Sequence, residues 1–183
     1  MRYKVTFLDY WHLSSGLSAG AKFDSMVTKD KDNLPYIPGK TIKGLAKEMA
    51  ELTNNKEFVF ECFGSSSDTK DYFYSEENIP SKCYFSNVEI EENTRKIITK
   101  EKLQNKLFDE IASTKIDKNG IAKTGSLREI EVVVPISLFG EIKNIPDDYK
   151  QEMIKALKKI KRMGLNRNRG LGRCKIEIIG EEK

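Results

Sequence analysis

The strongest constraint on the fold is the way that hydrophobic residues change their spacing along the chain. Near the N-terminus apolar side chains recur at every second position, at Tyr3, Val5 and Phe7, which predicts a strand with one buried face. Residues 41–52 instead carry apolar side chains at helical spacing. No predicted strand is the long uninterrupted hydrophobic run that is typical of a parallel sheet. These patterns predict an α+β fold with an antiparallel sheet.

The rest of the chain continues this alternation of strands and helices. A length of 183 residues suits one domain, and we expect a single domain over residues 1–183. Pro135 interrupts a long apolar segment and predicts an edge strand or a bulge there. The other patterns predict strands at 82–90, 129–139 and 174–180, a short helix at 101–111, and a helix that opens at Pro146 and ends at Gly164. Polar segments predict insertions at about 12–39, 64–80 and 100–128.

Charge is distributed unevenly along the chain. Residues 150–175 contain ten Lys and Arg against one Glu, a net charge of +9. Residues 51–149 carry a net charge of −6. A polyanion would therefore bind at the basic C-terminal part of the chain.

Within the basic region one segment combines arginine with glycine. Arg167, Arg169 and Arg173 can each hold a phosphate through paired hydrogen bonds. Three glycines are interleaved with them, at Gly164, Gly170 and Gly172. Glycine lets a protein backbone approach a nucleic-acid strand closely. The segment therefore predicts binding of RNA or DNA rather than of a small ligand.

Membrane and export signals are not evident in the sequence. The longest uncharged run, Tyr10–Ala21, has twelve residues and is too short and too polar to span a bilayer. Asp9 interrupts the N-terminal region before a secretory signal could develop. The three cysteines, Cys62, Cys83 and Cys174, are widely spaced, which favours ordinary buried thiols over a zinc site or disulfides. We expect a cytoplasmic protein that has no membrane segment.

A nucleotide-binding motif is suggested and then excluded by the residues before the predicted helix. Gly39, Lys40 and Thr41 lead into a helix, as they would in a P-loop. A P-loop directs successive backbone N–H groups at phosphates, but Pro35 and Pro38 have no N–H to offer. We therefore exclude a P-loop ATPase or GTPase.

Carboxylates and the histidine leave several chemical hypotheses open. Asp24, Asp30 and Asp32 lie within nine residues and could hold a divalent metal, act as a general base, or serve as turn residues. Their spacing does not select among the three residues. His12 is the only histidine, and beside Trp11 at the end of a predicted strand we expect it to have a structural role.

Two segments resemble a known family. LPYIPGKTIKGLAKEMAEL and the later GLNRNRGLGRCKIEI resemble the RAMP superfamily of CRISPR-associated proteins. In that superfamily a PxIPGxxxKG-type segment opens a helix, and a glycine-rich loop that bears arginine precedes the last strand. The shorter segments ECFGSS and CYFSNVEI are similar to further parts of the family pattern. The resemblance implies a ferredoxin-like, RRM-type core with inserted loops and a thumb-like hairpin.

Within the superfamily the chain is most similar to the repeating backbone subunit of type III effector complexes. FDSMVTKDKDNLPYIPG supplies Asp24, Val27, Lys29 and Asp30 in the order found in that subunit. The resemblance implies that Asp24 is the catalytic aspartate and holds a divalent metal, for which Mg²⁺ is the expected ion. It also implies that copies of the chain stack with other effector subunits along a guide crRNA, and that each copy cleaves bound target RNA.

The resemblance also suggests which residues contact RNA. A guide reads its target by base pairing, so the protein contacts backbone and shape. The hairpin around residues 113–128 would wedge into the guide–target duplex, and the lysines after Pro38 would converge with the arginines and glycines near the C-terminus to hold one RNA strand. The expected RNA-binding residues are Lys40, Lys43, Arg128, Gly164, Arg167, Arg169, Gly170, Gly172 and Arg173.

Three alternatives stay open. The chain could be a structural subunit of the same kind of complex that does not cleave RNA. It could be a guide-processing endoribonuclease that works without metal and uses His12. From a different class, it could be an adaptor for an acidic partner, whose binding would depend little on salt or on phosphate competitors.

Overall fold

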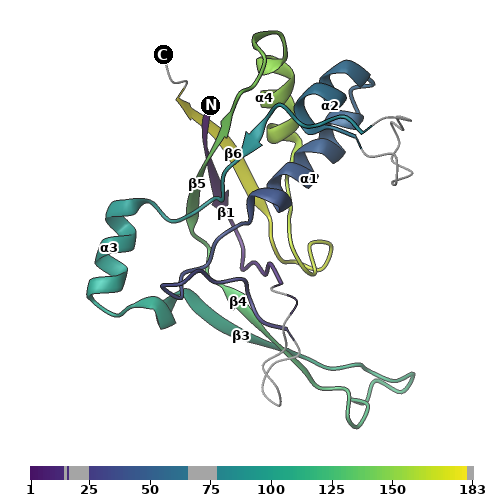
Figure 1. Ribbon diagram of the computed structural model, residues 1–183. Helices are drawn as coiled ribbons and strands as arrows, with labels where there is room; N and C mark the ends of the chain where they lie inside the picture. The colour runs from purple at the N-terminus through teal and green to yellow at the C-terminus, as the bar shows by residue number, and fades with distance from the viewer. Residues whose placement is uncertain (15, 17–24, 66–77, 181–183) are drawn as a thin grey trace.

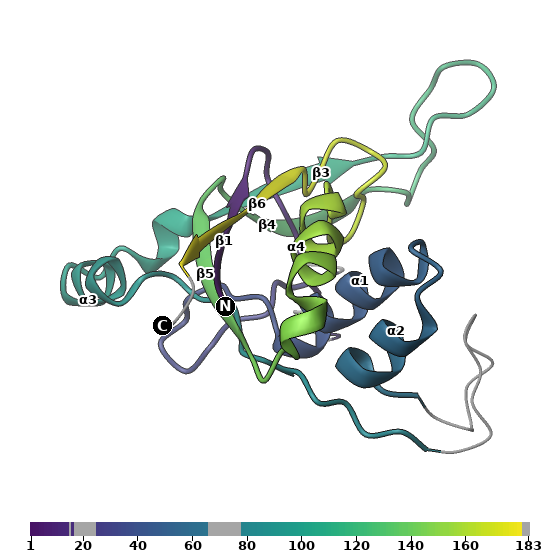
Figure 2. The ribbon, with the colours of Figure 1, turned by 90° about the horizontal axis from the view of Figure 1, so that it is seen from above.

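The computed structural model of the chain describes residues 1–14, 16, 25–65 and 78–180. Its centre is a four-stranded antiparallel sheet (Figure 1). The strands are β1 (Arg2–Phe7), β2 (Tyr84–Phe85), β5 (Ser137–Lys143) and β6 (Cys174–Gly180), in the spatial order β2-β5-β1-β6. The helices α1 (Gly39–Glu51), α2 (Lys56–Phe63) and α4 (Lys150–Lys159) cover one face of this sheet, as the view from above shows (Figure 2).

The order of these elements along the chain defines the core. It runs β1, α1, β2, β5, α4, β6, which is the βαββαβ connectivity of a ferredoxin-like fold. The predicted α+β class with an antiparallel sheet is therefore confirmed. None of the helices in the described part of the chain is long and apolar enough to cross a bilayer.

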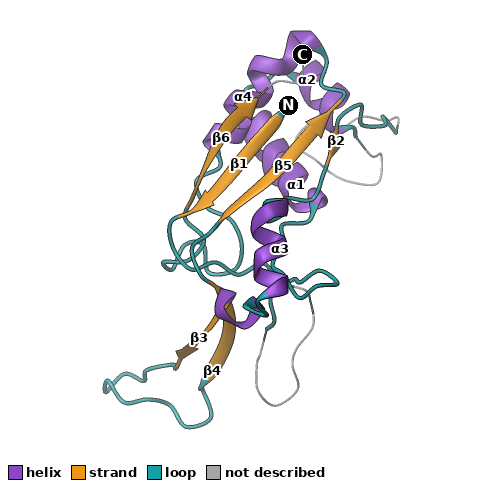
Figure 3. Ribbon diagram, turned by 90° about the vertical axis from the view of Figure 1, so that its left-hand side faces the viewer, coloured by secondary structure: helices purple, strands orange, loops and turns teal. Residues whose placement is uncertain are grey.

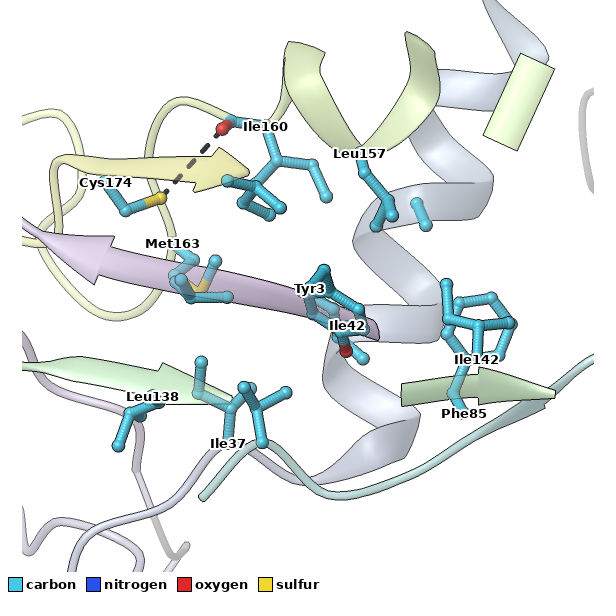
Figure 4. Close-up of a cluster of buried hydrophobic side chains, with 14 of the residues drawn as sticks. Tyr3, Ile37, Ile42, Phe85, Leu138, Ile142, Leu157, Ile160, Met163 and Cys174 are labelled. Atoms are coloured by element: carbon cyan, nitrogen blue, oxygen red, sulfur yellow. Dashed lines mark hydrogen bonds between the residues drawn. The ribbon is translucent and has the colours of Figure 1, made fainter. Parts of the chain in front are cut away.

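The core follows from the hydrophobic spacing of its elements. Tyr3, Val5 and Phe7 of β1 are at most 2% exposed and face the helices. Ile42 of α1 and Leu157 of α4 lie in the same cluster of buried side chains (Figure 4). Burying each such side chain stabilises the fold by roughly 1.5–3 kcal/mol.

A glycine in the centre of β5 has a packing reason. A Cβ atom at Gly140 would lie 2.7 Å from the ring of Tyr3 and 3.1 Å from Val88. The sheet can therefore accommodate the fully buried tyrosine ring only because this position has no side chain.

The remaining elements lie outside the βαββαβ core. The strands β3 (Phe108–Ser113) and β4 (Arg128–Val133) pair as an antiparallel hairpin that projects away from the main sheet (Figures 1 and 3). A backbone bridge between Trp11 and Val133 joins its base to the segment that follows β1. The helix α3 (Glu92–Lys100) and the short 3-10 helices η1 (Gln104–Leu107) and η2 (Asp147–Tyr149) complete the described elements.

Several boundaries differ from the sequence prediction. The expected strand at 82–90 is reduced to β2, with only isolated bridges at Val88 and Glu89. The single strand expected at 129–139 is two strands in different sheets, because Pro135 lies where the chain leaves β4 for β5. Pro135 has no N–H to continue a ladder. The last helix ends at Lys159 instead of Gly164, since Ile160 already has an extended conformation with ψ of 108°.

Two helices were placed incorrectly or missed. The helix expected at 101–111 is only partly present: its first half contains the 3-10 helix η1, its second half is the strand β3, and the α-helix of this region lies earlier, as α3. The sequence analysis did not predict α2, although its signals are present. Asn55 caps it by accepting a hydrogen bond from the Phe58 backbone N–H at 3.1 Å, and Phe58, Val59, Cys62 and Phe63 are buried. Most of the insertion expected at 64–80 lies outside the described residues.

Candidate nucleic-acid interface

The glycine- and arginine-rich loop between α4 and β6 is held by the segment that follows β1. The backbone N–H of Leu165 donates to the His12 carbonyl, and that of Gly172 donates to the Tyr10 carbonyl, each at 2.8 Å. Within the loop, Met163 donates from its backbone N–H to the Gly172 carbonyl at 3.0 Å. These three bonds fix the base of the loop and leave its tip, residues 166–170, at the surface.

Two of the three glycines are required by the protein itself. Gly164 has a φ of +92°, and a Cβ atom there would clash with the His12 carbonyl. Gly172 has a φ of +71°, and a Cβ atom there would clash with the Met163 carbonyl. Gly170, with a φ of +93°, faces open space. Only Gly170 therefore offers the free backbone approach that the sequence analysis expected of all three.

The arginines of the loop differ in how far the protein occupies them. Arg173 forms a two-pronged ion pair with Asp9, with Nε 3.1 Å and Nη2 3.2 Å from the two carboxylate oxygens. Arg162 donates from Nη1 to the Arg167 carbonyl at 3.1 Å. Arg167 and Arg169 are exposed, and their guanidinium groups have no partner among the residues that the structure describes. These two side chains are free to bind a phosphate.

The lysines expected to join this loop stand elsewhere. Gly39 at the start of α1 donates its backbone N–H to Asn87 Oδ1 at 3.0 Å, and a Cβ atom there would clash with the Phe85 carbonyl, so α1 begins beside β2. Lys40 is exposed there. Lys43 is half-buried, and burial lowers the pKa of its ammonium group.

The sheet order therefore separates the two basic groups. The loop leads into β6 and α1 begins beside β2, and these are the two outer strands of the sheet. One RNA strand that contacts both groups has to cross the width of the sheet.

The proposed catalytic residue, Asp24, lies outside the described residues, but the segment that follows it is well anchored. Ser25 forms a backbone bridge with Ile130 of β4. Glu131, next along β4, is buried and accepts from the Val27 backbone N–H at 3.1 Å. Its other oxygen is 2.6 Å from the Lys29 ammonium nitrogen. This carboxylate therefore ties residues 27–29 to the base of the hairpin.

His12 belongs to the same polar cluster and has a structural role, as expected. It is fully buried, with Nδ1 2.5 Å from the Glu131 carbonyl oxygen and Nε2 2.9 Å from Ser25 Oγ. Because a carbonyl only accepts, Nδ1 carries the proton, and Nε2 accepts from the serine hydroxyl. Burial lowers the pKa of the imidazole and favours its neutral form. Because the ring is fully buried, it does not reach RNA at the surface, as the base of a guide-processing ribonuclease must.

Two of the three candidate aspartates form a structural turn. Asp30 Oδ1 accepts from the backbone N–H groups of Asp32 at 2.8 Å and Leu34 at 3.0 Å. The Arg95 guanidinium of α3 pairs with both carboxylates, 2.7 Å from Asp30 and also in contact with Asp32. The turn interpretation therefore holds for Asp30 and Asp32.

The described residues alone do not make a divalent-metal site. No group of three or more His, Cys, Asp or Glu in the described part of the chain could hold a metal ion. Glu131, Asp30 and Asp32 are occupied by Lys29, by Arg95 and by backbone donors.

The hairpin tip combines apolar and basic side chains. Ile116, Ile121 and Leu127 are 62–64% exposed on the segment that joins β3 and β4. The chain folds back within this segment, where Asp117 donates its backbone N–H to the Ile121 carbonyl at 2.8 Å. Arg128 is exposed at the start of β4. An apolar wedge beside cations is the arrangement that proteins insert between stacked bases.

Some residues of this region were missed by the sequence analysis. Arg95 organises the turn at Asp30 and Asp32, and no local pattern shows a contact across so many residues of the chain. Glu131 left a signal: a charge at a position whose neighbours Val132 and Val133 are apolar indicates a buried carboxylate that needs a partner.

The βαββαβ sheet, the projecting hairpin and the anchored basic loop together define a ferredoxin-like protein with an inserted thumb and a surface suited to polyanions. The sequence profile of the RAMP superfamily matches residues 4–175. The chain belongs to the RAMP superfamily, as its sequence motifs implied.

Solved structures share the same architecture. The chain is similar to one in the cryo-EM structure of the type III-B Cmr-β complex bound to cognate target RNA, with a TM-score of 0.67 and 11% identity over 96% of this chain and 95% of the other. It is equally similar to one in the apo state of Cmr-β, with a TM-score of 0.68 and 12% identity over the same shares. Among curated proteins no sequence matches this chain.

Proposed function

We propose that this chain is a backbone subunit of a type III CRISPR effector complex, which binds guide crRNA together with copies of itself and other subunits and cleaves complementary target RNA. The observation that carries the proposal is the basic loop: its base is fixed by hydrogen bonds to the segment after β1, while Arg167 and Arg169 at its tip have no protein partner in the described part of the chain. The resemblance of the fold to subunits of Cmr-β complexes supports it. Such a complex would work in the cytoplasm.

Backbone recognition explains the basic groups on this surface. Guanidinium groups bind phosphates through two parallel hydrogen bonds, and they do so whatever the base sequence. Lys40 stands in the first turn of α1, where no acidic residue offsets the positive end of the helix dipole. A phosphate at this helix start would relieve that unfavourable arrangement. The protein thus holds the guide by its backbone while base pairing reads the target.

Cleavage would need few protein groups. The 2′-hydroxyl of RNA can attack the neighbouring phosphate, and a carboxylate at Asp24 would take its proton while nearby cations stabilise the negative charge that develops on the phosphate oxygens. The bond from phosphorus to the 5′-oxygen of the next nucleotide then breaks, which leaves a 2′,3′-cyclic phosphate and a 5′-hydroxyl that takes its proton from water. Glu131 anchors the residues that follow Asp24, through the Val27 N–H and the Lys29 ammonium group. Mg²⁺ commonly binds through one or two carboxylates together with substrate phosphates, so Asp24 and the RNA itself would supply its ligands.

The first experiment tests RNA binding. The double variant Arg167→Ala/Arg169→Ala should recover much less small RNA of uniform length when the protein is isolated with its complex. The matched control, Lys100→Ala/Lys106→Ala, removes the same charge from exposed positions on α3 and η1. Equal RNA recovery by the two double variants would refute the assignment of the loop.

The second experiment tests catalysis. Asp24→Ala should abolish cutting of a complementary RNA by the assembled complex and leave the recovery of guide RNA unchanged, and a chelator should stop cutting by the unaltered complex. Cutting that survives Asp24→Ala would reject this aspartate. A complex that binds guide but never cuts would favour the structural-subunit alternative.

A further inference from the structure

The outer strand β6 presents an unpaired edge. In the four-stranded sheet it pairs only with β1 (Figure 3). Leu8 donates its backbone N–H to the Arg173 carbonyl at 2.8 Å, so the odd-numbered residues of this strand direct their backbone groups toward β1. Cys174 donates its N–H to the Lys161 carbonyl at 2.9 Å, on the opposite side. The backbone groups of Ile176 and Ile178 therefore point outward.

Nothing in the described part of the chain pairs with this edge beyond Cys174. No hydrogen bond between described residues uses the outward N–H and C=O groups of Ile176 and Ile178. Unpaired edges of this kind are templates for another extended chain. The edge is short. The regular pairing of β6 with β1 ends at Ile178, opposite Tyr3, because the register then shifts so that Arg2 lies opposite Gly180.

The groove along this edge is positively charged. Lys158 and Lys161 line it on the side of α4, and neither forms an ion pair with a described residue. Lys175 and Glu177 line it from the open face of the sheet and pair with each other at 2.7 Å. The uncompensated charge therefore comes from the two lysines on the helix side.

We propose that the β6 edge binds an extended acidic peptide segment of a partner protein, which adds to the sheet as a fifth strand. Ile176 and Ile178 would supply the backbone hydrogen bonds. Since side chains alternate along a strand, acidic side chains at every second position of the peptide would face Lys158 and Lys161. The proposal concerns a different surface from the basic loop and does not depend on the proposed RNA function.

Two other occupants fit this surface less well. The β6 edge of a second copy would bring the same unpaired lysines together, and their repulsion opposes such a dimer. RNA would pair its phosphates with the lysines, but it carries no alternating row of N–H and C=O groups that continues the ladder at Ile176 and Ile178. A peptide strand satisfies the donors, the acceptors and the charge together.

A labelled peptide of about eight residues that alternates Glu with Val provides the probe, with the full chain as the binding partner. We expect saturable binding by fluorescence anisotropy, and at least about tenfold weaker binding to Lys158→Glu/Lys161→Glu. The matched control Lys155→Glu/Lys159→Glu reverses exposed charges of α4 that do not line the groove and should bind like the unaltered chain. A peptide with Lys in place of Glu should not bind.

Amide hydrogen exchange, followed residue by residue by NMR, tests the geometry. In the free chain Ile176 and Ile178 should exchange fast and Lys175 and Glu177 slowly, and the Glu–Val peptide should slow exchange at Ile176 and Ile178. The proposal is overturned if the peptide does not bind, if both charge reversals affect it equally, or if protection does not alternate. Concentration-dependent dimerisation through this edge, or displacement of the peptide by a single-stranded RNA that protects neither amide, would also overturn it.

Discussion

At the scale of single residues, the buried carboxylate of Glu131 has the most consequences. It holds the Val27 N–H and the Lys29 ammonium group, which also lies 4.0 Å from the centre of the Phe108 ring. A buried charge that loses its partner is costly, because the remaining group stays removed from water. The cluster beside Asp24 is therefore held by a contact whose loss should be measurable in the stability of the whole chain.

Replacing this carboxylate by its amide should expose that dependence. Glu131→Gln keeps the shape of the side chain but leaves Lys29 without a counter-charge, so the free energy of unfolding in urea should fall by about 2–3 kcal/mol. In the double variant Glu131→Gln/Lys29→Met the stranded charge is gone, and part of this loss should return. Two single losses that simply add would show that the pair is not coupled.

His12 predicts a pH dependence at the same scale. Burial lowers the pKa of its imidazole below the ordinary 6.5, with Glu131 opposing that shift more weakly. The unfolded chain then binds the proton more readily, so this group contributes stability above about pH 6.5 that is lost as the pH falls toward the folded pKa. In His12→Asn the difference in the free energy of unfolding between pH 7.5 and pH 5 (roughly bracketing the ordinary imidazole pKa) should be smaller. An unchanged difference would contradict the assignment.

At the scale of elements, the sequence patterns correctly predicted the helices and strands whose formation depends on the spacing of their own hydrophobic residues. The alternation of β1, the apolar stripes of α1 and α4 and the closing strand β6 are all present, because each element buries the face that its own pattern supplies. The hairpin base and the turn at Asp30 depend on distant partners, Trp11 with Val133 and Asp30 with Arg95. No stretch of neighbouring residues contains both partners of those contacts. The division of residues 129–139 into two strands at Pro135 was also not predictable locally, because the two strands pair in different sheets.

The basic loop makes a prediction at this scale through its glycines. Gly172→Ala places a methyl group against the Met163 carbonyl at a positive φ, so the loop must open and the melting temperature should fall strongly. Gly170→Ala has a similar φ but meets open space, and should cost about 1 kcal/mol. Thermal unfolding of the two variants separates the cost of the clash with Met163, which only Gly172→Ala has, from the cost of a positive φ, which both variants share. Equal shifts would mean that the contact of Gly172 with Met163 does not hold the loop.

At the scale of the whole molecule, the ferredoxin-like core supplies the stability of the fold, and the hairpin supplies a surface for recognition. The core cluster extends over all three sheet-covering helices, whereas the hairpin tip leaves its large apolar side chains in water. Exposed apolar side chains contribute little to folding, and a group of them on one projection is typical of a surface that meets a partner. Changes at the tip should therefore alter function without altering the fold.

The variant Ile116→Ser/Ile121→Ser tests this division. Both side chains are more than 60% exposed, so the melting temperature should stay within about 2 °C of the unaltered chain. If the tip wedges into the guide–target duplex, cleavage of target RNA by the assembled complex should fall about tenfold, because polar side chains no longer hold the bases apart. Ile97→Ser, 59% exposed on α3, is the control and should leave cleavage unchanged. A large loss of stability in the double variant would instead show that the hairpin packs against the body, and full cleavage would assign the wedge to another segment.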